Sequence, residues 1–150
     1  MRAFHKRILL VFGWLAFSAA VAQAGTAVAK FEAILIWGTN GSAPTNSALS
    51  SVEPEVLRKL KTLPFKWSQY YEVHRETFEV DQGKQRKVTM SKDCVIVVGA
   101  ADSETVEVEL HGKGKRVGQI TQKLPKRELL VVGGDAEDTT SWFVVLRRVE

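Results

Sequence analysis

From Trp67 to the C-terminus, apolar and polar residues alternate, and turn-forming residues recur about every ten positions. Alternation with a period of two places successive side chains on opposite faces of a strand, so that one face of each strand is apolar. Short strands at this regular spacing are typical of all-β sandwiches and barrels. We therefore expect a mainly β fold, an antiparallel β-sandwich or partly closed barrel of about eight strands.

The first strand of this fold comes before the alternating region. The run FEAILIWG, residues 31–38, is apolar, too short for a typical helix and bounded by turn residues, which indicates a buried strand. The polar stretch that follows, residues 38–52, contains Asn40-Gly41 and Pro44 and has few apolar residues to bury. We expect it to be a surface loop.

One short helix is expected near residues 54–62. Pro54 suits the first turn of a helix, Glu55 is favourable near its positive N-terminal end, and Pro64 ends it. The apolar residues fall on one stripe, as expected for a helix that covers a face of a sheet. They are Val56, Leu57, Leu60 and Leu63.

A long strand, YYEVHRETFEV, changes its facing along its length. The apolar residues Tyr71 and Val73 share one parity, whereas Phe78 and Val80 share the other. Because side chains alternate strictly in a regular strand, an extra residue must reset the pattern. We expect a bulge near residues 75–77.

The first 24 residues have the organisation of a secretory signal peptide. The basic segment MRAFHKR precedes the apolar run ILLVFGWLAFSAAVA, and Ala22 and Ala24 form an Ala-x-Ala cleavage site. Cleavage is expected after Ala24, with cleavage after Ala22 as the alternative. The apolar run, about 15 residues long, is short for a membrane span. We therefore expect residues 25–150 to form a single secreted or periplasmic domain without a transmembrane segment.

The charge of the mature chain argues against one class of partner. The whole chain has 21 basic and 17 acidic residues, and signal cleavage removes three of the basic ones, which leaves 18 against 17 and a net charge of +1. Nucleic-acid binding depends on many cations that neutralise phosphates. We therefore expect no nucleic-acid partner.

The chain has one cysteine, Cys94, so it cannot form an internal disulfide. About 126 mature residues are enough for a single domain with a core of its own. Cys94 opens the apolar run CVIVVG without a neighbouring His or Asp pattern, so we interpret it as a small buried hydrophobe. No cofactor is expected.

The stretch VVGGDAEDTTSWFVV joins two apolar runs and contains the candidates for a cation site. Its acids, Asp135, Glu137 and Asp138, lack the calcium-loop spacing D-x-[DN]-x-[DN]-G, and the stretch does not match the phosphate loop G-x-x-x-x-G-K-[ST]. Turn chemistry explains the same residues, because Gly133 and Gly134 permit positive φ. We predict a β-hairpin and no metal site.

The segment HGKGKR also predicts a hairpin turn. Its His111, Lys113, Lys115 and Arg116 would then gather at one exposed tip, where they can contact an anionic glycan or a lipid headgroup. The alternative is a solvated turn without a ligand, since three cations on one turn give only a modest, salt-screened attraction.

Glu72, His74 and Glu76 alternate on the long strand. If all three share one face, they can support metal ligation or acid–base chemistry. The same spacing occurs in any half-exposed strand whose other face is buried. The expected bulge within this strand favours the second interpretation.

Several aromatic residues are candidates for a sugar-stacking platform. In small β domains aromatic residues usually belong to the core, because each buries a large apolar area. Tyr70 is out of phase with Tyr71, so Tyr70 is the ring that we expect to face outward. The candidates are Trp37, Trp67, Tyr70, Tyr71 and Trp142.

The segment LPKRELLVVGG resembles a stretch, L-P-x-x-E-x-x-x-x-G-G, of bacterial outer-membrane secretins, where it forms part of the barrel-forming domain. Outside this segment the chain is shorter than secretins and lacks their repeated small domains. The signal peptide, the short helix and the closing WFVVLRR are together similar to small secreted bacterial β-domain proteins of unassigned function. That resemblance implies an extracytoplasmic β domain and no enzymatic activity.

These features favour a non-enzymatic binding or adaptor domain outside the cytoplasm, with an envelope or extracellular protein as its partner. The alternative is a glycan- or surface-binding module that uses Tyr70 and the HGKGKR turn. A small hydrolase built around Glu72, His74 and Glu76 is the third hypothesis.

The mature protein should begin at Gly25, or at Gln23, and should be found outside the cytoplasm, because the cleavage site follows an export signal. N-terminal sequencing of the protein recovered from cells that express the full chain checks this prediction. An intact Met1 in a soluble cytoplasmic fraction would contradict it.

Overall fold

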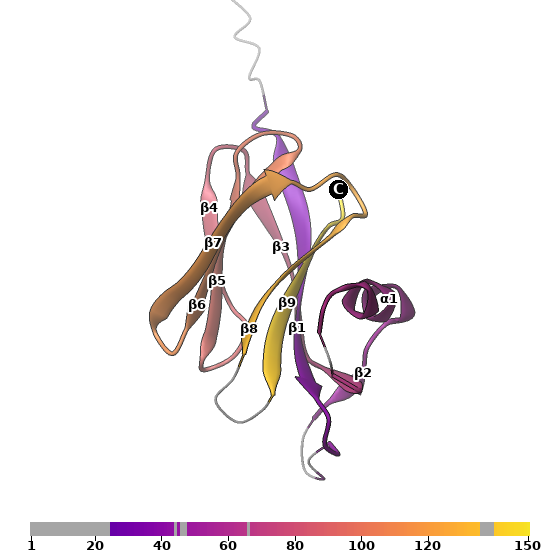
Figure 1. Cartoon of the computed structure of the whole chain (residues 1–150). Coiled ribbons are helices and arrows are strands. Elements are labelled where there is room, and N and C mark those ends of the chain that lie inside the picture. The colour runs from indigo at the N-terminus through magenta and orange to yellow at the C-terminus, as the bar shows by residue number, and fades with distance from the viewer. Residues whose placement is uncertain (1–24, 44, 46–47, 66, 136–139) are drawn as a thin grey trace, which may run out of the picture.

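The computed structural model describes residues 25–150, apart from 44, 46–47, 66 and 136–139 (Figure 1). The expected signal peptide, residues 1–24, lies outside this part of the chain. The described residues form two antiparallel sheets that pack face to face, together with one short helix. The expectation of an antiparallel β-sandwich is confirmed. Within the described residues, no helix has the length and apolar character that a membrane span requires.

The larger sheet has five strands in the order β2-β3-β1-β9-β8, and the smaller sheet has four in the order β4-β5-β6-β7. The strands of the larger sheet are β1 (Val28–Thr39), β2 (Ser50–Ser51), β3 (Gln69–Asp81), β8 (Leu129–Asp135) and β9 (Ser141–Arg148). The strands of the smaller sheet are β4 (Gln85–Thr89), β5 (Cys94–Ala100), β6 (Thr105–Gly112) and β7 (Lys115–Lys123). The described chain therefore has one strand more than expected, because two residues of the predicted 38–52 loop pair with β3 as β2.

Strand β1 lies at the centre of the larger sheet and is buried on both faces. Its Phe31 and Leu35 point into the core between the two sheets, whereas Ile34 and Ile36 point to the opposite face. This burial on both sides explains why FEAILIWG reads as a nearly continuous apolar run and does not alternate.

The helix α1 (Pro54–Thr62) has the bounds that the sequence predicts, with proline in its first turn, Glu55 beside it and lysines in its last turn. Figure 1 shows α1 on the face of the larger sheet that is turned away from the smaller one. Its Val56 and Leu60 are fully buried there. With them pack Ile34, Ile36, Tyr70, Phe143 and Val145 of the sheet, a set that we call the outer cluster.

The inner core fills the space between the two sheets. Phe31 and Phe78 stack within it with ring centroids 5.9 Å apart. At one end the guanidinium of Arg148 lies 5.5 Å from the centroid of the Phe31 ring, and its Nη1 is buried without a hydrogen-bond partner among the described residues. Cys94 is half-buried against the inner core, where burial raises the pKa of its thiol to about 11, as the interpretation of a small buried hydrophobe implies.

The bulge in the long strand lies earlier than we expected. Leu35 pairs with His74 and Ile36 pairs with Glu72, so Val73 is the extra residue of β3. The expected position at residues 75–77 was wrong. The packing of Val73 against the inner core provides the physical reason, because an apolar residue occupies the bulge and the strand stays regular through Thr77.

The hairpin at the end of the chain is confirmed, because β8 and β9 pair in antiparallel register from Leu129↔Arg147 to Asp135↔Ser141. Its tip, residues 136–139, lies outside the described residues. The reason for glycine at position 133 differs from the one expected, because Gly133 does not have a positive φ. A Cβ atom at this position would lie 2.6 Å from the carbonyl oxygen of Trp142 and 2.7 Å from Cδ1 of Phe143.

Replacement of Gly133 by Ala should therefore destabilise the fold by about 1–3 kcal/mol, the usual cost of forcing an atom into a filled space. The matched control is Gly118→Ala, since a Cβ atom at Gly118 meets nothing within 4 Å and its φ is not positive. That variant should stay within about 0.5 kcal/mol of the parent. Urea unfolding of the three proteins measures both effects, and equal stabilities would contradict the steric argument.

Candidate functional site

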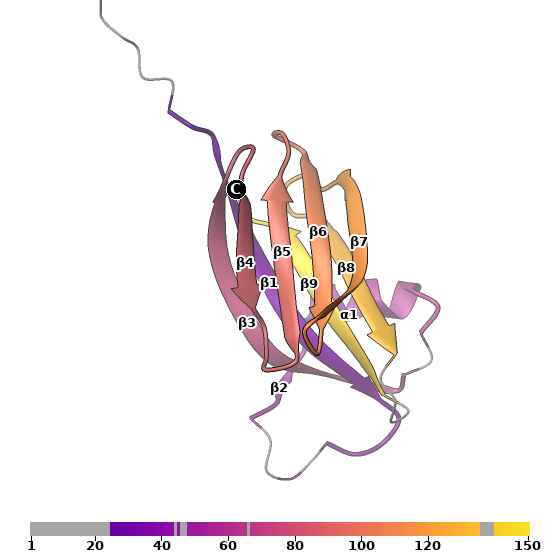
Figure 2. The same ribbon diagram turned by 90° about the vertical axis from the view of Figure 1, so that its left-hand side faces the viewer.

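The two sheets leave one side of the sandwich open. Strands β7 and β8 are the edge strands of their sheets, and the connection 124–128 brings them to the same side of the molecule. In Figure 2 the smaller sheet faces the viewer, with β7 at its free edge and β8 behind it. An edge strand directs alternate backbone N–H and C=O groups away from its only neighbour. Among the described residues, this side of the sandwich therefore has backbone groups without a strand partner on both sheets.

A groove of about 280 Å³ runs between these two edges. Most of the side chains that line it are apolar, and Val117 is 62% exposed. The lining residues are Val108, Leu110, Val117, Gly118, Gln119, Ile120, Val131, Val132 and Gly133. The groove therefore combines an apolar floor with hydrogen-bonding strand edges, which are the two elements that an added strand needs.

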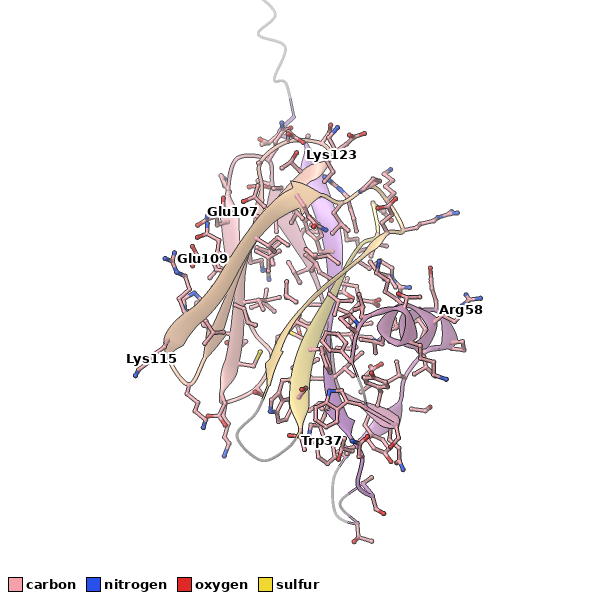
Figure 3. The ribbon with its side chains drawn as sticks, in the orientation of Figure 1. Trp37, Arg58, Glu107, Glu109, Lys115 and Lys123 are labelled. Carbon is pink, nitrogen blue, oxygen red and sulfur yellow. The ribbon has the colours of Figure 1, made fainter. Side chains whose placement is uncertain are left out.

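Strand β7 is exposed along its whole length except at the half-buried Ile120. It carries two features that natural edge strands use against uncontrolled pairing, a bulge at Val117 and a lysine at each end. Figure 3 shows these lysines, Lys115 and Lys123, at opposite ends of the strand. Between the bulge and Lys123, residues 118–122 are uncharged and regular, which leaves a short stretch where a strand can add.

The HGKGKR segment forms the turn at one end of this groove. Lys113 (φ 49°) and Gly114 (φ 79°) both have positive φ, the geometry of a two-residue hairpin turn, so the predicted hairpin is confirmed. Lys113, Lys115 and Arg116 are exposed, as expected for a tip. His111 is half-buried, and its Nε2 lies 3.0 Å from Oε2 of Glu109 on the outer face of the smaller sheet.

Tyr70, the aromatic residue that we expected to face outward, is buried. Its ring lies under α1 in the outer cluster, 6.0 Å from the ring of Phe143, and burial raises the pKa of its hydroxyl. Alternation alone suggested exposure because it cannot show that a helix covers the second face of the sheet. Trp67 packs against the same cluster. Tyr70 is therefore separated from the basic turn, which belongs to the other sheet.

Glu72, His74 and Glu76 do not converge, because the bulge at Val73 places Glu72 on the face covered by α1. His74 and Glu76 remain together, with Nε2 of His74 3.3 Å from Oε2 of Glu76, and both are well exposed. Acid–base chemistry through all three groups requires one shared face. This strand does not provide it.

The cation candidates of the β8–β9 tip fall largely outside the described residues. Glu137 and Asp138 lie in the segment 136–139, and the side chain of Asp135 is not described. Elsewhere in the described chain, no group of three or more His, Cys, Asp or Glu side chains has the arrangement of a metal site.

A cluster of ionic side chains lies beside the N-terminus of α1, and no local pattern in the sequence indicates it. In this cluster the guanidinium of Arg147 contacts three carboxylates, with Glu32 at 2.5 Å, Glu53 at 2.7 Å and Glu55 at 3.2 Å. Arg75 contacts both oxygens of Glu72, at 2.9 and 2.8 Å, and reaches Glu32 and Glu53. We call the group the ion cluster; it contains Glu32, Glu53, Glu55, Glu72, Arg75 and Arg147.

The ion cluster ties the start of α1 to three strands of the larger sheet. The hydrogen bond from Arg147 holds the pKa of Glu53 below its usual range, and the pKa values of Arg147 and Arg75 are raised by their carboxylate partners. Every guanidinium of the cluster is paired with carboxylates, so its charges are occupied in holding the helix in place. We therefore interpret the ion cluster as structural.

Comparisons of the chain with protein-family models, with curated proteins and with solved structures find no match. The segment LPKRELLVVGG forms the connection after β7 and most of β8.

A Glu53→Gln variant should be less stable than the parent at pH 7, by about 1 kcal/mol. Because the folded-state pKa of Glu53 is lowered, its stabilising contribution is present above the unfolded pKa, about 4, and is lost as the pH falls through the folded value. The difference between the two proteins should thus shrink between pH 6 and pH 3, roughly the window of this titration.

Urea unfolding at several pH values measures this difference. The control is Glu104→Gln, whose carboxylate lies 3.6 Å from Lys123 with 58% of its side chain exposed. It should change stability by less than about 0.5 kcal/mol at any pH. A difference between parent and Glu53→Gln that stays constant with pH would contradict the proposed linkage.

Proposed function

We propose that this domain is a non-enzymatic binding module that takes an extended segment of a partner protein onto its open side. The observation that carries the proposal is the apolar groove between two free strand edges, β7 and β8. A strand added there gains backbone hydrogen bonds from β7 and buries alternate side chains against residues such as Val117, Ile120 and Val132.

Charge around the groove favours a particular kind of segment. Strand β7 has no acidic residue, and exposed cations stand at its two ends and in the connection to β8. They are Lys113, Lys115, Arg116, Lys123, Lys126 and Arg127, with Glu128 as the one exposed acid of the connection. The partner segment is therefore one with alternating apolar residues and acidic flanks, because complementary charge speeds the encounter and sets the register.

A binding role agrees better with the described residues than a hydrolase does. The third hypothesis required Glu72, His74 and Glu76 on one face, and the bulge at Val73 separates the first from the other two. With the secretory signal expected at residues 1–24, the partner is an envelope or extracellular protein.

The test is photo-crosslinking in cells that express the full chain. A benzophenone amino acid at position 117, in the groove, should give a covalent adduct with a second protein. The same amino acid at Lys87, which is exposed on β4 at the far edge of the smaller sheet, is the matched control and should give none. Adducts should also decrease in Lys115→Gln/Lys123→Gln, since the flanking cations are lost. Absence of a protein adduct at position 117, or equal adducts at both positions, would refute the proposal.

A further inference from the structure

Three aromatic side chains form a row across neighbouring strands of the larger sheet. Trp37 on β1 pairs in register with Tyr71 on β3 and with Trp142 on β9. The ring centroids of Trp37 and Tyr71 are 6.0 Å apart, with the rings tilted by 33°. Directly opposite residues on adjacent strands point to the same face of a sheet, so the three rings stand side by side on one face.

This aromatic row lies on the inner face of the sheet but beyond the core. Trp37 has the same parity as Leu35, and Trp142 the same parity as Val144, both of which belong to the inner core. Neither of the two apolar clusters formed by the described residues includes any ring of the row. Figure 3 shows Trp37 at the lower end of the larger sheet, below the smaller sheet.

The rings are open to solvent to different degrees. Trp142 is 42% exposed, and Trp37 and Tyr71 are half-buried. The partner of Trp142 on β8 is Gly134, which has no side chain that can cover the indole.

Polar groups without charge flank the row. Ser51 on β2 lies opposite Tyr71, and the side chain of Gln69 accepts a hydrogen bond from the Tyr71 hydroxyl. Both Ser51 and Gln69 are exposed. Among the described residues, the row therefore offers aromatic faces next to the hydroxyl of Ser51 and the amide of Gln69.

We propose that the aromatic row binds a neutral oligosaccharide made of pyranose rings. One face of a pyranose presents C–H groups, which pack favourably on the electron-rich face of an aromatic ring. The sugar hydroxyls around that face need neutral donors and acceptors, which Ser51, Gln69 and Tyr71 supply. From Tyr71 to Trp142 the row spans two strand spacings, about 10 Å, so it accommodates more than one sugar ring.

The size of the row favours a glycan over a second protein. An aromatic side chain contributes at most about 150–250 Å² of buried area, and two of the three rings are already half-buried. A stable protein interface needs about 800 Å² from each partner. The row is thus too small for a protein interface by itself, and it uses residues other than those of the groove between β7 and β8.

The test is binding of the mature chain to neutral polysaccharides, by pull-down on insoluble cellulose and chitin and by calorimetry with their soluble oligosaccharides. The parent should bind at least one of these ligands. Trp142→Ala should weaken that binding at least about tenfold, whereas Trp142→Phe, which keeps an aromatic face, should retain most of it. Val149→Ala is the matched control, because Val149 follows the same strand and is exposed to a similar extent, 40%.

Thermal melts separate a loss of binding from a loss of folding. If Trp142→Ala melts earlier than the parent, tryptophan fluorescence of the parent provides the second measurement, and an oligosaccharide-dependent change in emission that Trp142→Phe reduces supports the proposal. A parent that binds none of these ligands, or a folded Trp142→Ala that binds as the parent does, would overturn it. A Trp142→Ala variant that loses the capture of a protein and still binds the oligosaccharides as the parent does would also overturn the proposal.

Discussion

The burial of β1 on both faces is the constraint on which the rest of this structure depends. The strand pairs with β3 on one side and with β9 on the other, so it has no free edge. Its Phe31 and Leu35 anchor the inner core, its Ile34 and Ile36 anchor the outer cluster, and Glu32 enters the ion cluster. Both layers that cover the larger sheet, the smaller sheet and α1, are therefore held by the same strand.

The two sheets are covered unequally, and this difference determines which surfaces of the sheets stay open. The larger sheet is covered by the smaller sheet on one face and by α1 on the other, whereas the outer face of the smaller sheet carries exposed or half-exposed polar residues such as Lys87 and Glu107. Both proposed surfaces occur where the layers fail to overlap. The groove follows the open side between β7 and β8, and the aromatic row lies at the end that the smaller sheet does not cover.

Local chemistry allowed the helix and most strands to be predicted, because Pro54, Pro64 and the spacing of apolar residues act within a few positions. The face of the sheet to which each side chain points was harder to predict. The burial of Tyr70 depended on the helix that covers its face of the sheet, and the position of the bulge depended on which residue of β3 packs against the core. The ion cluster joins residues as far apart as Glu32 and Arg147, 115 positions, so no local pattern indicates it. The open side had a signal in the sequence, since KRVGQITQK contains few apolar residues for a strand with two neighbours.

The pairing of β1 with β9 joins the first long strand of the chain to the last one, from Phe31↔Arg148 to Gly38↔Ser141. The centre of the larger sheet is thus assembled from two strands that lie far apart in the sequence, a contact that requires closure of a very long loop. Until β9 has been synthesised, β1 lacks its neighbour on one side, so the larger sheet cannot be completed. A stop codon before Ser141 would therefore remove a strand from the interior of the larger sheet and not from its edge.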